Sequence, residues 1–171
     1  AGVRKGAVDN AAGVSALLEL ARSFAKNPPK RSLIFAAVTG HEQGLLGTEY
    51  LLDIGFPRGL QPVAGVNLDS PLVTFPFVDM AVHGASSTNL MPVVSQVLKR
   101  NRVGINRQPV PGQQHVDGSD HQSFVRRRLP SVYLTVGAGG GGEEQYLLFE
   151  QRHHGSVSDT YRLIRFDQLA R

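Results

Sequence analysis

Hydrophobic and polar positions follow two different patterns along the chain, and each pattern predicts a different kind of secondary-structure element. Apolar residues recur at spacings of three and four, as in helices that bury one face, over residues 10–26, 45–53, 88–102 and 159–170. A continuous apolar run occupies residues 32–38, and mainly apolar segments occupy residues 62–68, 78–83 and 131–136; both are typical of strands covered on both sides. Strands that alternate with helices predict an α/β fold in three layers, with a mainly parallel sheet between helices on both faces.

The length and composition agree with a single folded domain over residues 1–171. Hydrophobic residues make up 41% of the chain, which is enough to build a core. The apolar runs are far shorter than the ~18–20 residues of a membrane helix. The chain contains no cysteine, which excludes disulfides, a cysteine nucleophile and thiolate ligands to a metal.

The charge pattern gives little support for a nucleic-acid partner. The net charge is +4, and basic residues gather at 99–102 and 126–128. Neither cluster contains an aromatic residue, whereas single-stranded nucleic acids are usually bound by basic and aromatic side chains together. We interpret both clusters as solvated helix ends, and we expect no nucleic-acid and no membrane partner.

Carboxylates and histidines follow the apolar runs at the points where sheet strands would end. Their oxygen and nitrogen atoms form a ligand set suited to a hydrolytic Zn²⁺ site, or to Mn or Co. In open α/β sheets, sites form at the carboxyl ends of strands. The candidate residues are Asp9, His41, Glu42, Asp69, His153 and His154.

Each candidate also has a structural interpretation. Asp9 could be a helix N-cap and Asp69 a turn residue, while Glu42 could be a solvated helix start and His154 an exposed loop histidine. The four structural interpretations are less convincing in combination, because they would require four unrelated polar residues to occur at strand ends by coincidence.

The candidate residues lie in short segments of characteristic composition. Five such segments are GAVDNAAG at 6–13, TGHEQGLLGT at 39–48, NLD at 67–69, SDHQSF at 119–124 and HGSVSDT at 154–160. In this order they resemble G-A-x-D-N-x-x-G, G-E-E-x-G-L-x-G-S, N-L-D, S-D-H-x-x-F and H-x-x-x-D-T, the motifs of the M28 family of zinc-dependent aminopeptidases. Each segment is a weak signal alone, but the ordered set covers nearly the whole chain.

The resemblance implies a role for each matched residue. Asp9 would bridge two metal ions, Asp69 would bind one of them, and Glu42 and His154 would bind the other. Asp120 would accept hydrogen bonds behind the ligands and orient its neighbours, although it could equally be the N-cap of a helix over 121–127. Ser119 is interpreted as a turn residue, since it lacks the G-x-S-x-G setting of a serine nucleophile.

The sequence departs from the family pattern at three places. His41 replaces the general-base Glu, and it could serve as the base, bind metal itself or abolish activity. No histidine precedes Asp9 to serve as the family's first ligand, so we expect one well-held zinc and a second that is weak or absent. His154 lies one residue farther from Asp159 than is usual, which makes His153 an alternative ligand. His83 and His115 match no motif and are expected at the surface or behind the ligands.

The resemblance implies a hydrolase that releases N-terminal residues from peptides, or cleaves related amides and esters. The alternatives are a catalytically impaired homologue that acts as a binding domain and a single-zinc enzyme similar to glutaminyl cyclases. We expect the chain to lack the family's N-terminal strands, which would leave an exposed sheet edge. A second copy or a partner segment would then cover that edge. The resemblance favours a secreted or periplasmic location.

Overall fold

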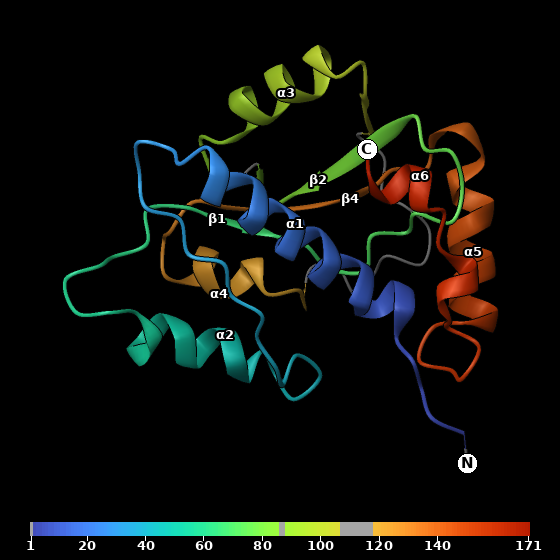
Figure 1. Cartoon of the computed structure of the whole chain (residues 1–171), viewed down its shortest axis with the longest axis horizontal. Coiled ribbons are helices and arrows are strands. Elements are labelled where there is room, and N and C mark those ends of the chain that lie inside the picture. The colour runs from blue at the N-terminus through green and yellow to red at the C-terminus, as the bar shows by residue number, and fades with distance from the viewer. Residues whose placement is uncertain (1, 86–87, 107–117) are drawn as a thin grey trace.

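Four strands form one mixed sheet in the order β1-β4-β2-β3 (Figure 1). The computed structural model describes residues 2–85, 88–106 and 118–171. The strands are β1 (Gly65–Asn67), β2 (Asp79–His83), β3 (Gly104–Asn106) and β4 (Ser131–Val136). β1 pairs with β4 and β2 with β3 in parallel, while β2 and β4 run antiparallel. The predicted α/β class with a mostly parallel sheet is therefore confirmed.

Helices and single helical turns connect and surround these strands. The α-helices are α1 (Ala12–Lys26), α2 (Leu46–Tyr50), α3 (Met91–Arg100), α4 (His121–Arg126), α5 (Gly142–Arg152) and α6 (Phe166–Leu169). The shorter turns are η1 (Ala7–Ala11), η2 (Leu51–Gly55), η5 (Gly139–Gly141) and η6 (Tyr161–Leu163). Among the described residues, no helix is long and apolar enough to span a membrane.

Several predicted elements agree closely with the observed helices and strands. β4 coincides with the predicted strand over 131–136, and β2 occupies all but one residue of the predicted 78–83. α3 lies inside the predicted helix 88–102. The turn η1 followed by α1 accounts for the predicted helix 10–26. The predicted strand 62–68 is shorter in the structure, where only Gly65–Asn67 pair with a neighbour.

The strand predicted over residues 32–38 is not present in the structure. This segment is not hydrogen-bonded to any of the four described strands, and the side chains of Leu33, Ile34 and Phe35 are exposed. An apolar run becomes a strand only when its backbone finds a partner, and the described strands pair with one another instead. The segment leaves apolar surface uncovered. The expectation that a second copy or a partner segment covers an exposed sheet edge stays a prediction.

The second half of the chain differs from the sequence-based prediction at several places. The helix expected over 159–170 is broken into η6 and α6, because Ile164 and Arg165 between them have extended backbones. The sequence pattern missed β3, and it missed α5, which follows the glycine run at 137–142. Consequently His153 and His154 lie at the end of a helix, not in a simple loop after β4.

The hydrophobic core lies where the sheet meets α5 and the segment after β1. It contains Val8, Leu72, Val73, Phe75, Phe77, Ala81, Val136, Tyr146 and Phe149. The Tyr146 hydroxyl donates to the Val136 carbonyl at 2.7 Å and lies 2.8 Å from the Thr135 hydroxyl, which ties α5 to β4. This packing fixes the end of α5, and with it His154, relative to the sheet.

Candidate metal centre

The candidate site begins just beyond the end of β1, where the chain leaves the sheet. Asp69 stands two residues after the last residue of this strand. Its backbone carbonyl accepts the Tyr133 hydroxyl of the neighbouring strand β4 at 2.9 Å. The sheet therefore holds the Asp69 backbone directly, as expected for a residue at the carboxyl end of a parallel strand.

The loop that carries Asp9 is held by a carboxylate from the far end of the chain. Asp159, only 2% exposed, accepts the backbone N–H of Val8 at 2.8 Å and that of Asp9 at 3.1 Å. Two backbone donors that would otherwise lack a partner are satisfied by one buried side chain. Asp159 therefore sets the position of the Asp9 backbone.

Asn10 and Ser70 join the Asp9 loop to the end of β1. The Asn10 side-chain oxygen accepts the backbone N–H groups of Gly13 and Ser70, both at 3.1 Å. The Ser70 hydroxyl lies 2.7 Å from Asp9 Oδ1 and 3.3 Å from Asp69 Oδ1, so it links the two carboxylates. It is Asn10, not Asp9, whose side chain caps the first turn of α1.

His154 directs one ring nitrogen at Asp9. Its Nε2 lies 3.4 Å from Asp9 Oδ2, and its Nδ1 lies 2.9 Å from Glu150 Oε2 one helical turn earlier. His153 instead places its Nδ1 2.8 Å from the Ser158 hydroxyl. Of the two candidate histidines, His154 is therefore the one that approaches Asp9.

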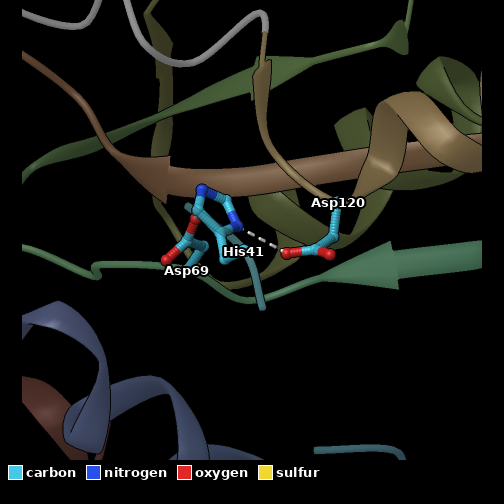
Figure 2. Close-up of side chains that lie close together, drawn as sticks. All are labelled: His41, Asp69 and Asp120. Atoms are coloured by element: carbon cyan, nitrogen blue, oxygen red, sulfur yellow. Dashed lines mark hydrogen bonds and ion pairs between the residues drawn. The ribbon is translucent and has the colours of Figure 1, made fainter. Parts of the chain in front are cut away.

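His41 has the same arrangement on the other side of the site (Figure 2). Its Nδ1 lies 2.8 Å from Asp120 Oδ2, and its Nε2 lies 3.9 Å from Asp69 Oδ2. The Thr48 hydroxyl donates a hydrogen bond to the second Asp120 oxygen. Each histidine thus has a carboxylate at Nδ1 and directs Nε2 toward a second carboxylate. Metal-binding histidines commonly have this environment, because a carboxylate on one nitrogen fixes the orientation of the other.

The electrostatic environment of the site favours positive charge. The hydrogen bond to Asp120 and the nearby Asp69 raise the pKa of His41 to about 9. Burial raises the pKa of Asp69, although the Ser119 hydroxyl and His41 act in the opposite direction. Burial also acts to raise the pKa of Asp120, but hydrogen bonds from His41 and Thr48 outweigh it and leave that pKa lowered. A carboxylate that is costly to leave charged gains from a cation beside it.

The two residues before α4 use their side chains inside the site. Ser119 donates its hydroxyl to Asp69 Oδ2 at 2.8 Å and accepts the Asn67 amide at 2.6 Å. Asp120 occupies the N-cap position of α4, but its carboxylate makes no capping hydrogen bond to the helix. The structure thus places Asp120 behind His41, where the sequence allowed either role.

The structure does not bring all the expected ligands into one group. Among the described residues, the histidine and carboxylate group whose ligand atoms lie within 4.8 Å of one another is His41, Asp69 and Asp120. Asp9 and His154 approach each other as a separate pair, and the Glu42 side chain is exposed to solvent. The assignment of Asp9, Glu42 and His154 to one metal ion stays a prediction.

The residues that match no motif lie elsewhere. The ring of His83 packs against Tyr133 with 5.3 Å between centroids. His115 lies outside the described residues. In the second basic cluster, Arg126 pairs with Glu49 at 2.9 Å and Arg127 with Asp53 at 2.6 Å, which agrees with a structural role.

Sequence reasoning missed the residues that support the ligands. Glu150 stands four positions before His154, so one helical turn brings their side chains together, and this spacing was a usable signal. Asp159 lies inside the matched motif, but nothing local showed that its carboxylate reaches the Asp9 loop. The sequence gave no role to Thr48, although it ends the matched segment over 39–48, or to Ser70, because their partners Asp120 and Asp9 lie 72 and 61 residues away in the chain.

The donor atoms at the site are of the types that bind zinc. Asp9 and Asp69 offer carboxylate oxygens, and His154 and His41 offer imidazole nitrogens, which are ordinary zinc ligands. Both histidines already have a carboxylate at Nδ1, which is the environment that orients a ligating ring. Burial of Asp69 supplies an electrostatic reason for a cation to bind beside it.

Curated relatives match the chain over short segments. A protein named "Probable zinc metalloprotease" from Pyrenophora tritici-repentis is 47% identical over 64 residues, which cover 37% of this chain and 15% of the relative. A protein of the same name from Phaeosphaeria nodorum is 44% identical over 61 residues, covering 36% of this chain and 12% of the relative. The matched segments span less than a sixth of these relatives.

Solved structures match the fold along nearly the whole chain. LapB from Legionella pneumophila superposes with a TM-score of 0.76 at 18% identity, covering 99% of this chain and 44% of LapB. BSAP, a zinc aminopeptidase from Bacillus subtilis, gives a TM-score of 0.73 at 20% identity, covering 99% of this chain and 40% of BSAP. At this identity the likeness establishes the fold alone.

The family comparison agrees with both results and covers the entire sequence. The model of peptidase family M28 matches residues 1–171, which include every motif and every candidate ligand described above. The chain belongs to peptidase family M28.

Proposed function

We propose that this chain carries the hydrolytic centre of a zinc-dependent peptidase that releases N-terminal residues from peptides or cleaves related amides and esters. The observation that carries the proposal is the pair of histidines that direct Nε2 at Asp9 and Asp69, with those carboxylates linked by Ser70. The relatives named zinc metalloproteases and the family membership support the same conclusion.

As the family resemblance implies, Asp9, Glu42 and His154 would hold the well-held zinc, and Asp9 and Asp69 would hold a weaker second ion. Zinc bound there would polarise the carbonyl of the scissile bond, and it would lower the pKa of a bound water toward neutrality. Asp159 and Asn10 hold the Asp9 loop, and the sheet holds Asp69. Asp9 and Asp69 are thus held by the fold before a metal arrives, which lowers the entropic cost of binding.

His41 is proposed as the group that accepts a proton from the attacking water and returns it to the leaving amine. Its Nδ1 is occupied by Asp120, so proton transfer takes place at Nε2, the nitrogen on the side of Asp69. Because Asp120 and Asp69 raise the pKa of His41 to about 9, the ring is protonated near neutral pH when no cation is present. A neutral, proton-accepting ring therefore requires a compensating positive charge beside Asp69.

The proposal is tested by hydrolysis of aminoacyl-nitroanilides and simple esters, with and without zinc, by the native chain and by His41→Glu. Zinc-dependent turnover by the native chain supports the proposal. Turnover by His41→Glu alone would show that His41 impairs the site. Absence of turnover by both would refute hydrolysis and favour a binding domain. Cyclisation of peptides with an N-terminal glutamine would indicate the single-zinc cyclase.

A further inference from the structure

Thr48 is a buried polar residue at the end of the matched segment over 39–48, and neither the family resemblance nor the proposed ligand set gives it a role. Its side chain is only 2% exposed, and its hydroxyl donates a hydrogen bond to one carboxylate oxygen of Asp120. The other oxygen of the same carboxylate lies 2.8 Å from His41 Nδ1. Asp120 therefore has a different partner at each oxygen, and Thr48 is one of the two.

A compact turn joins His41 to α2, the helix that contains Thr48. The carbonyl of His41 accepts the N–H of Leu45 at 3.0 Å, and the carbonyl of Thr39 accepts the N–H of Gly47 at 2.8 Å. A Cβ at Gly47 would collide with the Thr39 carbonyl oxygen, so glycine is what allows this close approach. The separation of Thr48 and His41 is thus set locally, and Asp120 joins them from a distant segment.

The hydroxyl restricts a motion that a single hydrogen bond would leave free. The terminal torsions of aspartate and histidine are broad, so a carboxylate held by one donor can rotate and let the ring turn with it. With Thr48 on Oδ1 and His41 on Oδ2, the plane of the Asp120 carboxylate is fixed at two points. The ring then keeps Nδ1 on Asp120 and Nε2 on the side of Asp69 (Figure 2).

We propose that Thr48 is a positioning residue for His41, acting through Asp120 so that the imidazole presents Nε2 toward Asp69. The inference rests on the proposed function, since it concerns the orientation of the proposed proton acceptor. Thr48 does not touch the reacting atoms. Loss of a carboxylate that hydrogen-bonds a metal-site histidine typically lowers metal affinity or activity by 10–100-fold. Thr48 hydrogen-bonds such a carboxylate, that of Asp120, and does not contact His41 through its own hydroxyl bond.

The test compares three variants of the full chain. Thr48→Val removes the hydroxyl while keeping the volume, and Thr48→Ser restores it. Thr135→Val is the control for loss of a buried hydroxyl, because Thr135 is 1% exposed and its hydroxyl lies 2.8 Å from that of Tyr146. Three properties are measured in each: kcat and KM on an aminoacyl-nitroanilide, zinc stoichiometry, and solvent exchange of the His41 Nδ1–H in ¹⁵N-edited NMR. The Nδ1–H signal is assigned by its loss in His41→Gln.

We expect Thr48→Val to lower kcat about tenfold. Its KM should stay within about twofold and its zinc stoichiometry should be unchanged. The His41 Nδ1–H should exchange faster, Thr48→Ser should restore both kcat and slow exchange, and Thr135→Val should change neither. Slow exchange and a native kcat in Thr48→Val would overturn the proposal, as would a Thr48→Ser variant as impaired as Thr48→Val. If the native chain has no turnover, the proposed function fails, and the exchange rates alone decide the role of Thr48.

Discussion

Asp159 offers the sharpest test of how the fold positions the candidate ligands. Its buried carboxylate accepts two backbone N–H groups, from Val8 at 2.8 Å and from Asp9 at 3.1 Å. Asp159→Asn keeps the shape, but its amide has one oxygen to accept a hydrogen bond, so one N–H loses its partner. We expect the free energy of unfolding to fall by about 1.5–3 kcal/mol, the range for a hydrogen bond to a charged group. Asp159→Ala leaves both donors unsatisfied, and we expect a loss of about 3–5 kcal/mol.

The assay is urea unfolding of the zinc-free chain, followed by a thermal melt. For a chain of this length, ~2–4 °C per kcal/mol converts the Asp159→Asn loss into a melting temperature lower by about 3–12 °C. Because Asp9 is displaced with its backbone, zinc affinity measured by calorimetry should also fall, by about tenfold. Asp167→Asn is the matched control, since Asp167 is exposed and pairs with Arg165 at the surface.

Two results would refute this reasoning. Equal unfolding midpoints for the native chain and Asp159→Asn would show that the two backbone bonds contribute no net stability. An equal loss in Asp167→Asn would show that any removed aspartate charge has the same effect. A loss of stability without a loss of zinc affinity would separate the folding role of Asp159 from its proposed control of Asp9.

Three further predictions follow from the site and its surroundings. Glu150→Gln removes the carboxylate from His154 Nδ1 and should weaken zinc binding about tenfold in a chelator competition, whereas Glu143→Gln at the exposed start of α5 should not. His41 has a folded pKa of about 9 against an ordinary 6.5, so its contribution to the stability of the zinc-free chain is complete below about pH 6.5 and is lost as the pH rises through 9. Urea midpoints across this range should fall for the native chain and stay flatter for His41→Gln. The exposed apolar segment over 32–38 should drive association with a second copy at micromolar concentration, and a monomeric mass in light scattering would contradict this.

The sequence by itself determined the elements that local pattern controls. The uninterrupted run over 131–136 predicts β4 because a strand in the middle of the sheet needs apolar side chains on both faces. Asp69 could be placed at the site because a residue just beyond a parallel strand has its position set by the sheet. The ordered motifs also identified the family, because they record residue types and spacings that do not require coordinates.

Only the tertiary structure decided which of these residues meet. The run over 32–38 has a strand-like composition, yet it stays unpaired among the described residues, because pairing depends on backbone hydrogen bonds to a distant neighbour. The choice of His154 over His153 depends on where α5 ends relative to the Asp9 loop. The orientation of His41 depends on Asp120 and Thr48, whose carboxylate and hydroxyl meet across 72 residues of chain. Residue type can therefore be read locally, whereas the direction in which an imidazole points is set by long-range contacts.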